Sequence, residues 1–172
     1  MVGSTWISAY NGAIKKEAIV NEDLGNVHAS LTGRYEKVAT FIDAIQDANA
    51  TIQGYLDTIA QAREAFADAI SNNNNDAAYD SSATIDQTFV TLVSYMEDNP
   101  DSYNTVSLYI GYLDEFTAST NRVINDIGTY NEAVKEYNTH IQIFPNVIFV
   151  GSREKYTQYS TANYNATLPT FN

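Results

Sequence analysis

The hydrophobic pattern of the chain is most regular between residues 121 and 145, which read NRVINDIGTYNEAVKEYNTHIQIFP. Its apolar residues recur at alternating steps of four and three, at Val123, Ile127, Tyr130, Val134, Tyr137, Ile141 and Phe144. This alternation averages about 3.5 residues, which places every member on one narrow stripe of an α-helix and is typical of a helix packed against other helices. Pro145 lacks an amide hydrogen and disfavours a helical residue before it, so we expect the helix to end there.

The N-terminal half carries a second long apolar stripe, which runs from Tyr10 to Ile45 and resumes from Ile52 to Ile70. The segment between the two parts reads DANAT, and short polar residues of this kind prefer caps and turns to helix interiors. One unbroken helix here would be about 90 Å long, whereas the C-terminal pattern supports a helix of about 60 Å. We therefore expect a break near residues 47–51; one kinked continuous helix is the alternative.

Residues 71–83, SNNNNDAAYDSSA, lack an apolar stripe and are rich in the residue types that favour turns. The composition therefore predicts a flexible loop. A further helical pattern follows through Ile85, Phe89 and Val93, and the Asn99-Pro100 pair is expected to end it.

Together these patterns predict an all-α fold, an elongated up-and-down four-helix bundle with an irregular C-terminal tail. The expected helices span residues of about 6–46, 52–71, 83–98 and 103–144. We expect one helical domain over residues 1–150, with the tail over residues 151–172.

The charge of the chain narrows the class of partner. Nine Lys and Arg residues against 21 Asp and Glu residues give a net charge of −12. A nucleic-acid partner would need clustered positive charge, and the sequence has no such cluster. Electrostatic docking on an anionic membrane is disfavoured for the same reason. The absence of cysteine excludes disulfides and thiolate sites. No apolar run reaches the roughly 18 residues of a transmembrane helix, and residues 1–13 lack the features of a signal peptide.

Candidate catalytic groups are few. His28 and His140 are the only histidines, and Glu136 lies four residues before His140, which does not match the Glu-x-x-His pairs of di-iron bundles. No phosphate-binding glycine loop and no nucleophile motif occur. We therefore expect neither an enzyme nor a bound metal or cofactor.

Several short motifs have an order that points to a family. They are Tyr10-Asn11, Arg34-Tyr35, Ala62-Arg63, Asn99-Pro100, Asn121-Arg122, Tyr130-Asn131, Tyr137-Asn138 and Phe144-Pro145. With these residues the chain from Tyr10 to Phe149 resembles the LemA family of bacterial proteins. The chain departs from the family pattern at Gly33, where the family has the first of two arginines, and at Thr120, where it usually has a glutamate.

The resemblance implies a helical-bundle domain that follows one N-terminal transmembrane anchor, and it implies no enzymatic activity. We expect an anchor that is absent from the present chain, and a native protein that is single-pass and located at the cell membrane. The resemblance does not indicate the side of the membrane or the oligomeric state.

The residues most suited to contact a partner are arginines at family positions and the tyrosine–asparagine pairs of the C-terminal helix. They are Arg34, Arg63, Arg122, Tyr130, Asn131, Tyr137 and Asn138. An arginine in an apolar stripe either recognises an acidic group or pairs internally with a carboxylate. Tyrosine–asparagine pairs either line a carbohydrate or peptide groove or fill gaps between helices.

Two functions are consistent with these observations. The first is a non-catalytic, membrane-tethered scaffold or adaptor domain whose partners are envelope or membrane proteins. The alternative is a small-ligand or glycan-binding helical module of the cell envelope. A pocket lined by aromatic residues with convergent polar groups would favour the second, whereas a solid core with an exposed apolar patch would favour the first.

Overall fold

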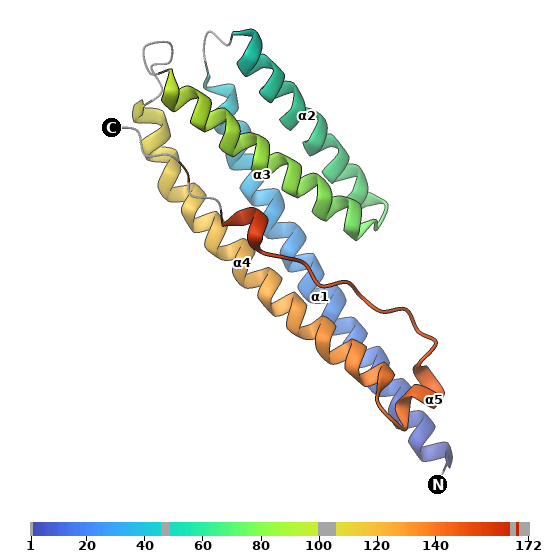
Figure 1. The fold of residues 1–172 in the computed structure, drawn as a ribbon. Helices are drawn as coiled ribbons and strands as arrows, with labels where there is room; N and C mark the ends of the chain where they lie inside the picture. The colour runs from blue at the N-terminus through green and yellow to red at the C-terminus, as the bar shows by residue number, and fades with distance from the viewer. Residues whose placement is uncertain (1, 46–48, 100–105, 166–167, 169–172) are drawn as a thin grey trace. The chain divides into compact units, whose positions relative to one another are not determined.

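The structure is a computed structural model that describes residues 2–45, 49–99, 106–165 and 168. All regular secondary structure in these residues is helical (Figure 1). The long helices are α1 (Val2–Asp43), α2 (Ala50–Ser71), α3 (Asn75–Asp98) and α4 (Val106–Gln142), followed by the short α5 (Asn146–Val150) and the 3-10 turn η2 (Ala162–Tyr164). The all-α class is confirmed, and the packing of the four long helices is consistent with an up-and-down bundle.

The chain divides into two compact units. Unit 1 comprises residues 1–29 and 125–160, and unit 2 comprises residues 30–124 and 161–172. The first part of α1 and the last part of α4 therefore belong to unit 1, and the rest of both helices belongs to unit 2. The single domain over residues 1–150 stays a prediction.

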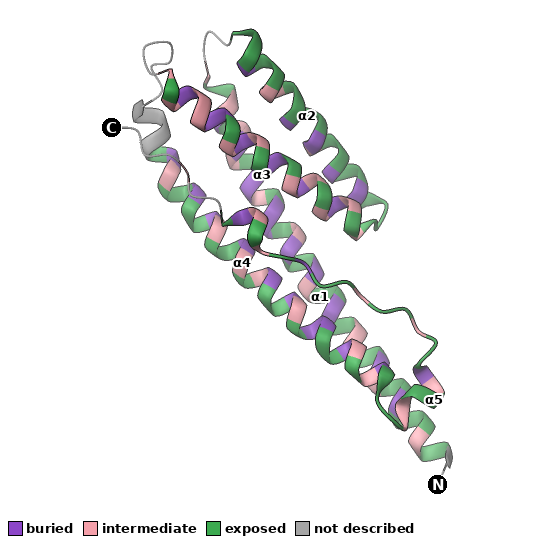
Figure 2. Ribbon diagram, viewed as in Figure 1, coloured by how far each residue is buried: buried purple, intermediate pink, exposed green. Residues whose placement is uncertain are grey.

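Unit 2 has a core of aromatic and aliphatic side chains between its helices. The rings of Phe41, Phe89, Tyr112 and Phe116 form contacts with centroid distances of 5.0–5.6 Å, and each of these residues is buried. Buried and exposed residues alternate along the helices of the unit (Figure 2). α2 packs along α3 as a helical hairpin. These contacts explain the apolar stripes of all four helices, because each stripe faces a neighbouring helix in this unit.

In unit 1, α1 and α4 pack through the stripe that the sequence predicts. Val134, Tyr137 and Ile141 are each at most 1 % exposed. Phe144 is different: it is 76 % exposed, although the pattern places it on the same stripe. The reason is that α4 ends at Gln142, so the helical period no longer orients Phe144 toward α1.

The predicted break between the first two helices is confirmed. α1 ends at Asp43, a few residues before the expected end, and α2 begins at Ala50. The side chain of Asn49 caps α2 by accepting a hydrogen bond from the amide of Ile52 at 2.9 Å, which satisfies an amide that has no partner within the helix. Of the predicted break region, residues 47 and 48 lie outside the described part of the chain.

The predicted end of the third helix is confirmed as far as the chain is described. α3 ends at Asp98, directly before the Asn99-Pro100 pair, and Asn99 caps it through its amide. Pro100 itself and residues 103–105, where the fourth helix was expected to begin, lie outside the described residues, as does most of the tail after residue 165.

The predicted loop over residues 71–83 is wrong in most of its length. α3 begins at Asn75, and only Asn72 to Asn74 separate it from α2. Asn73 has a φ of 55°, in the left-handed region that asparagine tolerates. Ser82, which the sequence places in the loop, is fully buried in α3. Small and polar residues form the first turns of this helix, so their composition concealed it.

Removing the cap of α3 gives a direct test of this start. The Asn74 side chain accepts a hydrogen bond from the amide of Ala77 at 3.2 Å. We expect Asn74→Ala to lower the free energy of unfolding by about 1 kcal/mol, the usual value of a side-chain N-cap. Urea denaturation should show no such loss for Asn75→Ala, the matched control one residue further. Equal behaviour of the two variants would contradict the assigned cap.

Candidate functional site

Two asparagines of α4 hold an extended segment of the same chain in unit 1. The Asn131 side chain donates to the carbonyl of Tyr159 at 2.7 Å and accepts from the amide of Tyr159 at 2.8 Å. Asn138 does the same to Tyr156, at 2.9 Å and 3.1 Å. Each side-chain amide thus pairs with both main-chain groups of one residue, as a neighbouring β-strand would.

The spacing of the two asparagines matches the spacing of their partners. Seven helical residues separate Asn131 from Asn138, a rise of about 10 Å, and three extended residues separate Tyr156 from Tyr159, again about 10 Å. The segment runs antiparallel to α4, because the later tyrosine pairs with the earlier asparagine. The heptad that brings both asparagines to one side of the helix therefore also sets the register of the bound segment.

Tyrosine side chains provide the apolar part of this seat. The ring of Tyr130 stacks on Tyr159 at 5.1 Å, and the ring of Tyr137 meets Tyr156 edge-on at 5.3 Å. The Tyr130 hydroxyl also donates to the carbonyl of Thr157 at 2.8 Å. We call the surface formed by Tyr130, Asn131, Tyr137 and Asn138 the tyrosine–asparagine seat.

Residues beside the seat hold the segment from the α1 side. Arg153 forms an ion pair with Glu17 and donates to the Tyr137 hydroxyl at 3.3 Å. The Tyr156 hydroxyl donates to the side chain of Asn21 at 3.3 Å. Of the seven residues expected to contact a partner, the structure therefore brings four together in unit 1, where they contact the chain's own residues 156–159.

The three arginines of that set lie in unit 2, in different surroundings. Arg34 is 2 % exposed, inside the core. Arg63 is half-buried and lines a shallow hollow of about 350 Å³ between α1 and α2, together with Glu36, Phe66 and others. Arg122 is exposed on α4. The arginines consequently form no common site.

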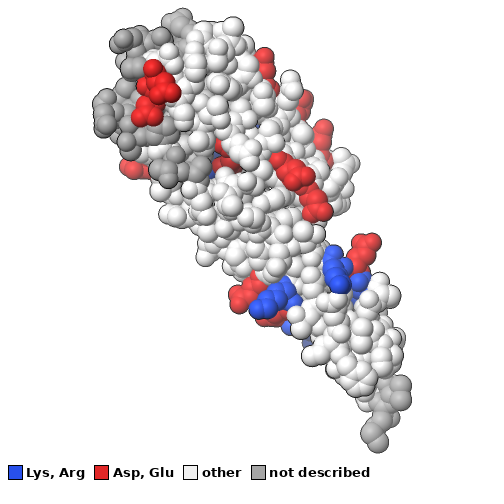
Figure 3. Space-filling model, in the orientation of Figure 1, with Lys and Arg blue, Asp and Glu red and all other residues white. Residues whose placement is uncertain are grey.

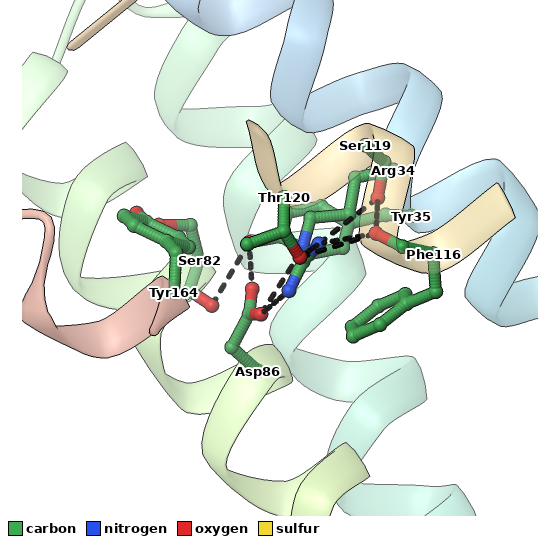
Figure 4. A network of polar contacts seen from close by, with 8 residues as sticks. All are labelled: Arg34, Tyr35, Ser82, Asp86, Phe116, Ser119, Thr120 and Tyr164. Atoms are coloured by element: carbon green, nitrogen blue, oxygen red, sulfur yellow. Dashed lines mark hydrogen bonds and ion pairs between the residues drawn. The ribbon is translucent and has the colours of Figure 1, made fainter. Parts of the chain in front are cut away.

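Arg34 is the centre of a buried polar network (Figure 4). Its guanidinium donates to one carboxylate oxygen of Asp86 from Nε at 2.9 Å and from Nη2 at 2.5 Å. Nη1 donates to the hydroxyls of Ser119 at 2.9 Å and Thr120 at 2.7 Å. The guanidinium carbon lies 3.7 Å from the centre of the Phe116 ring, a cation–π contact.

Two tyrosines extend this network, one bonded to the second carboxylate oxygen of Asp86 and the other to Ser82. The second oxygen of Asp86 accepts from the Tyr35 hydroxyl at 2.7 Å. Ser82 donates to the carbonyl of Tyr79, so the hydroxyl of Tyr164, 2.5 Å away, is the donor to Ser82. Tyr164 belongs to η2, which therefore docks onto α3 in unit 2 through this contact.

Burial dominates the titration of this network. It raises the pKa of the Asp86 carboxyl, while the charge and hydrogen bonds of Arg34 act in the opposite direction. It also raises the pKa of the Tyr35 hydroxyl well above its usual value near 10, with a contribution from the charge of Asp86. The pKa of Tyr164 is raised chiefly by the same loss of solvent.

These tyrosines make the stability of the fold sensitive to alkali. Above about pH 10 the unfolded chain loses their protons while the folded chain keeps them, so stability falls as pH rises. Each tyrosine contributes a slope of up to about 1.4 kcal/mol per pH unit. We expect denaturation curves between about pH 9 and about pH 11.5 to show a shallower loss for Tyr164→Phe than for the wild type. Parallel pH profiles would contradict the assigned burial of that hydroxyl.

The histidine of α4 has structural surroundings. The Nε2 atom of His140 lies 2.9 Å from the carbonyl of Ala9, and its ring packs on Gly12, where a Cβ would come within 2.5 Å of it. Glu136 pairs instead with Lys16 at 2.8 Å. Within the described residues, no three His, Asp or Glu side chains are grouped so that they could hold a metal ion.

Comparison with protein families decides which family the chain represents. The model of the LemA family matches residues 23–172, which is most of the sequence. The chain belongs to the LemA family. Searches among curated proteins and among solved structures each gave no significant match.

The LemA match includes the tyrosine–asparagine seat as well as the segment that fills it. It also includes the three residues of the Arg34 network that the resemblance names, which are Arg34, Tyr35 and Thr120. At Thr120, where the resemblance implies a glutamate, the hydroxyl is one of the acceptors of Arg34. The charge of Arg34 is balanced by Asp86 on α3.

Sequence reasoning missed Asp86, Tyr156 and Tyr159. A signal for Asp86 was present, since it shares the buried face of α3 with Ser82 and Phe89. The two tyrosines lie in a stretch without helical or strand period, so no pattern marks them. No described helix of this LemA-family chain is both long and apolar enough for a membrane span.

Proposed function

We propose that the chain is a non-catalytic scaffold or adaptor domain, tethered to a membrane, that binds extended segments of envelope proteins. The observation that carries this proposal is the tyrosine–asparagine seat, with its two side-chain amides paired to the main chain of an extended peptide. Recognition of this kind uses main-chain hydrogen bonds for affinity and side-chain contacts for selectivity. The membrane tether follows from the family resemblance.

The polar groups of unit 2 support a non-catalytic role. Asp86, Tyr35 and Tyr164, whose pKa values are raised by burial, are almost fully buried and hydrogen-bonded within the core, whereas a catalytic group must reach a substrate.

The segment that fills the seat defines the ligand it would select. The ligand is an extended peptide with two tyrosines three residues apart, since Tyr156 and Tyr159 supply both aromatic contacts. Between them, Thr157 contacts the seat through its carbonyl, whereas the Gln158 side chain donates to the main-chain carbonyl of Asn131 at 3.0 Å. Selectivity should therefore rest on the two tyrosines and on Gln158, and should tolerate change at residue 157.

A peptide-binding measurement tests the proposal with the full chain. Tyr156→Ala with Tyr159→Ala removes the aromatic anchors of the resident segment and should free the seat. A fluorescently labelled peptide with the sequence of residues 151–162 should then bind this double variant saturably, at least about tenfold more tightly than the wild-type chain, where the resident segment competes.

The asparagines provide the specificity control. Asn131→Ala with Asn138→Ala, added to the freed chain, should weaken peptide binding about tenfold or more, because four main-chain hydrogen bonds are lost. Asn125→Ala is the matched control, since Asn125 is exposed on the same helix. If the peptide does not bind, or if its affinity does not depend on Asn131 and Asn138, the seat only stabilises the fold and the proposed function is wrong.

A further inference from the structure

One end of unit 1 exposes a cluster of large apolar side chains. It is formed by the first turns of α1 and by the corner between α4 and α5. Its exposed members are Trp6, Ile7, Tyr10, Ile143, Phe144, Val147 and Ile148. Phe144 is 76 % exposed, Ile148 66 % and Trp6 48 %, far more than single surface residues of a packed helix require. We call this cluster the apolar end.

Contacts within unit 1 bring the two parts of the apolar end together. His140 near the end of α4 lies against Ala9 and Gly12 of α1, so the antiparallel helices place the corner after α4 beside the first turns of α1. Arg153, just after α5, lies 5.9 Å from the ring of Tyr10. The ring of Tyr10 also stacks on that of Trp6 at 5.7 Å.

The apolar end carries no charged side chain. Residues 3–14 and 141–152 contain no Asp, Glu, Lys or Arg, and all of them are described. Charged residues of both signs begin immediately beyond, at Lys15, Lys16 and Glu17 on α1 and at Arg153, Glu154 and Lys155 after α5. In Figure 3 this appears as a surface without red or blue between the charged belt and the grey atoms at the N-terminal end.

The short helix α5 shows that this exposure is not a matter of loose packing. Val150 is 2 % exposed, so α5 is fixed to the unit by one face. Val147 and Ile148 nevertheless remain outside, 43 % and 66 % exposed. A helix that buries one apolar residue and exposes two others has an apolar outer face, and the exposure of that face to water is unfavourable.

A lipid bilayer interface fits these features better than a protein partner. Tryptophan, tyrosine and lysine adjoining an apolar tip are the residues enriched where proteins meet the headgroup region. Stable protein interfaces use about 20–30 residues on each side, whereas the apolar end offers seven large apolar side chains. Basic residues are also relatively frequent in unit 1, which holds five of the nine Lys and Arg but only seven of the 21 Asp and Glu.

We infer that the apolar end of unit 1 inserts directly into the interfacial layer of a lipid bilayer, as a contact additional to any anchor. Phe144, Ile148 and Trp6 enter the headgroup–acyl boundary, and Lys15, Arg153 and Lys155 stay at the level of the headgroups. The contact rests on apolar insertion, so it does not require anionic lipid, in keeping with the net negative charge of the chain.

The single tryptophan provides the measurement. Trp6 is the only tryptophan, so its emission reports on the apolar end alone. We expect vesicles of zwitterionic phosphatidylcholine to shift this emission to shorter wavelength, and brominated phosphatidylcholine to quench it. The chain should also float with the vesicles on a density gradient. These experiments use residues 1–172 and no peptide, so their outcome is independent of the proposed adaptor function.

Two variants distinguish insertion from non-specific adsorption to the vesicles. Phe144→Asp with Ile148→Asp should raise the vesicle concentration needed for the shift and for flotation at least about tenfold, without changing the circular dichroism, since both positions are exposed. Ile19→Asp is the matched control: Ile19 is 49 % exposed on α1 but lies outside the apolar end, so binding should persist.

Three results would overturn the inference. The first is the absence of an emission shift with vesicles, and the second is an equal loss of binding in both variants. The third is a self-associated chain that Phe144→Asp with Ile148→Asp renders monomeric, because the apolar end would then be an interface between copies.

Discussion

Asp86→Ala should lower the free energy of unfolding by about 3–5 kcal/mol, because it leaves the guanidinium of Arg34 buried without its carboxylate. The remaining acceptors of Arg34 are the hydroxyls of Ser119 and Thr120 and the carbonyl of Phe116, which carry no compensating charge. The Tyr35 hydroxyl loses an acceptor as well. Equilibrium denaturation in urea near neutral pH measures the loss.

A double replacement distinguishes the buried charge from the loss of packing. Arg34→Met with Asp86→Leu removes both charges and keeps apolar volume in the core, and buried pairs replaced in this way are often neutral or stabilising. We therefore expect the double variant to be more stable than Asp86→Ala alone. An Asp86→Ala variant that loses less than about 1 kcal/mol would show that water reaches Arg34, contrary to its 2 % exposure.

The helices were predictable wherever an apolar stripe continued without interruption. The stripe through Val134 and Tyr137 located α4, and the polar residues after Asp47 located the break before α2. The start of α3 was not predictable by the same rule, because its first turns face the unit with Ala78 and Ser82. Small and polar residues bury well when a neighbour such as Tyr164 supplies the hydrogen bond, and that neighbour is 82 residues away.

The candidate site was predictable in its residue types only in part. The repeated tyrosine–asparagine pairs indicated a groove or a gap between helices, and the structure adds what lies against them. That partner is a segment without periodicity, so its pairing depends on tertiary distances that one sequence does not contain. Arg34 and Thr120 illustrate the same limit. The family resemblance drew attention to both positions, but their hydrogen bond at 2.7 Å joins residues that are 86 positions apart in the sequence.

Acidic residues and exposed apolar side chains are distributed unevenly between the two units. The net charge of −12 arises mainly in unit 2, which holds fourteen of the 21 acidic residues. Unit 1 holds the tyrosine–asparagine seat and the apolar end together. The two proposed contacts, one with peptide and one with lipid, consequently belong to the same unit, whereas the polar network of unit 2 is closed within its core.

The largest effect should come from Val134→Asp in unit 1. Val134 is fully buried at the centre of the α4 stripe, and its replacement places an ionised carboxylate among apolar side chains without a partner. The expected loss is about 4–5 kcal/mol or more, a large part of the roughly 5–15 kcal/mol that stabilises a typical domain. A thermal melt followed by circular dichroism should show a much lower midpoint or no folded baseline.

Thr129→Asp is the matched control for this result. It introduces the same charge into the same helix, five residues earlier, at an exposed position whose hydroxyl bonds back to the carbonyl of Asn125. We expect its melting temperature to stay within a few degrees of the wild type, because exposed substitutions usually change stability by less than about 0.5 kcal/mol. If Val134→Asp and Thr129→Asp have the same melting temperature, the stripe does not face α1 and the packing described for unit 1 is wrong. If Val134→Asp alone unfolds, the peptide seat should disappear with it, since its tyrosines and asparagines take their positions from that same helix.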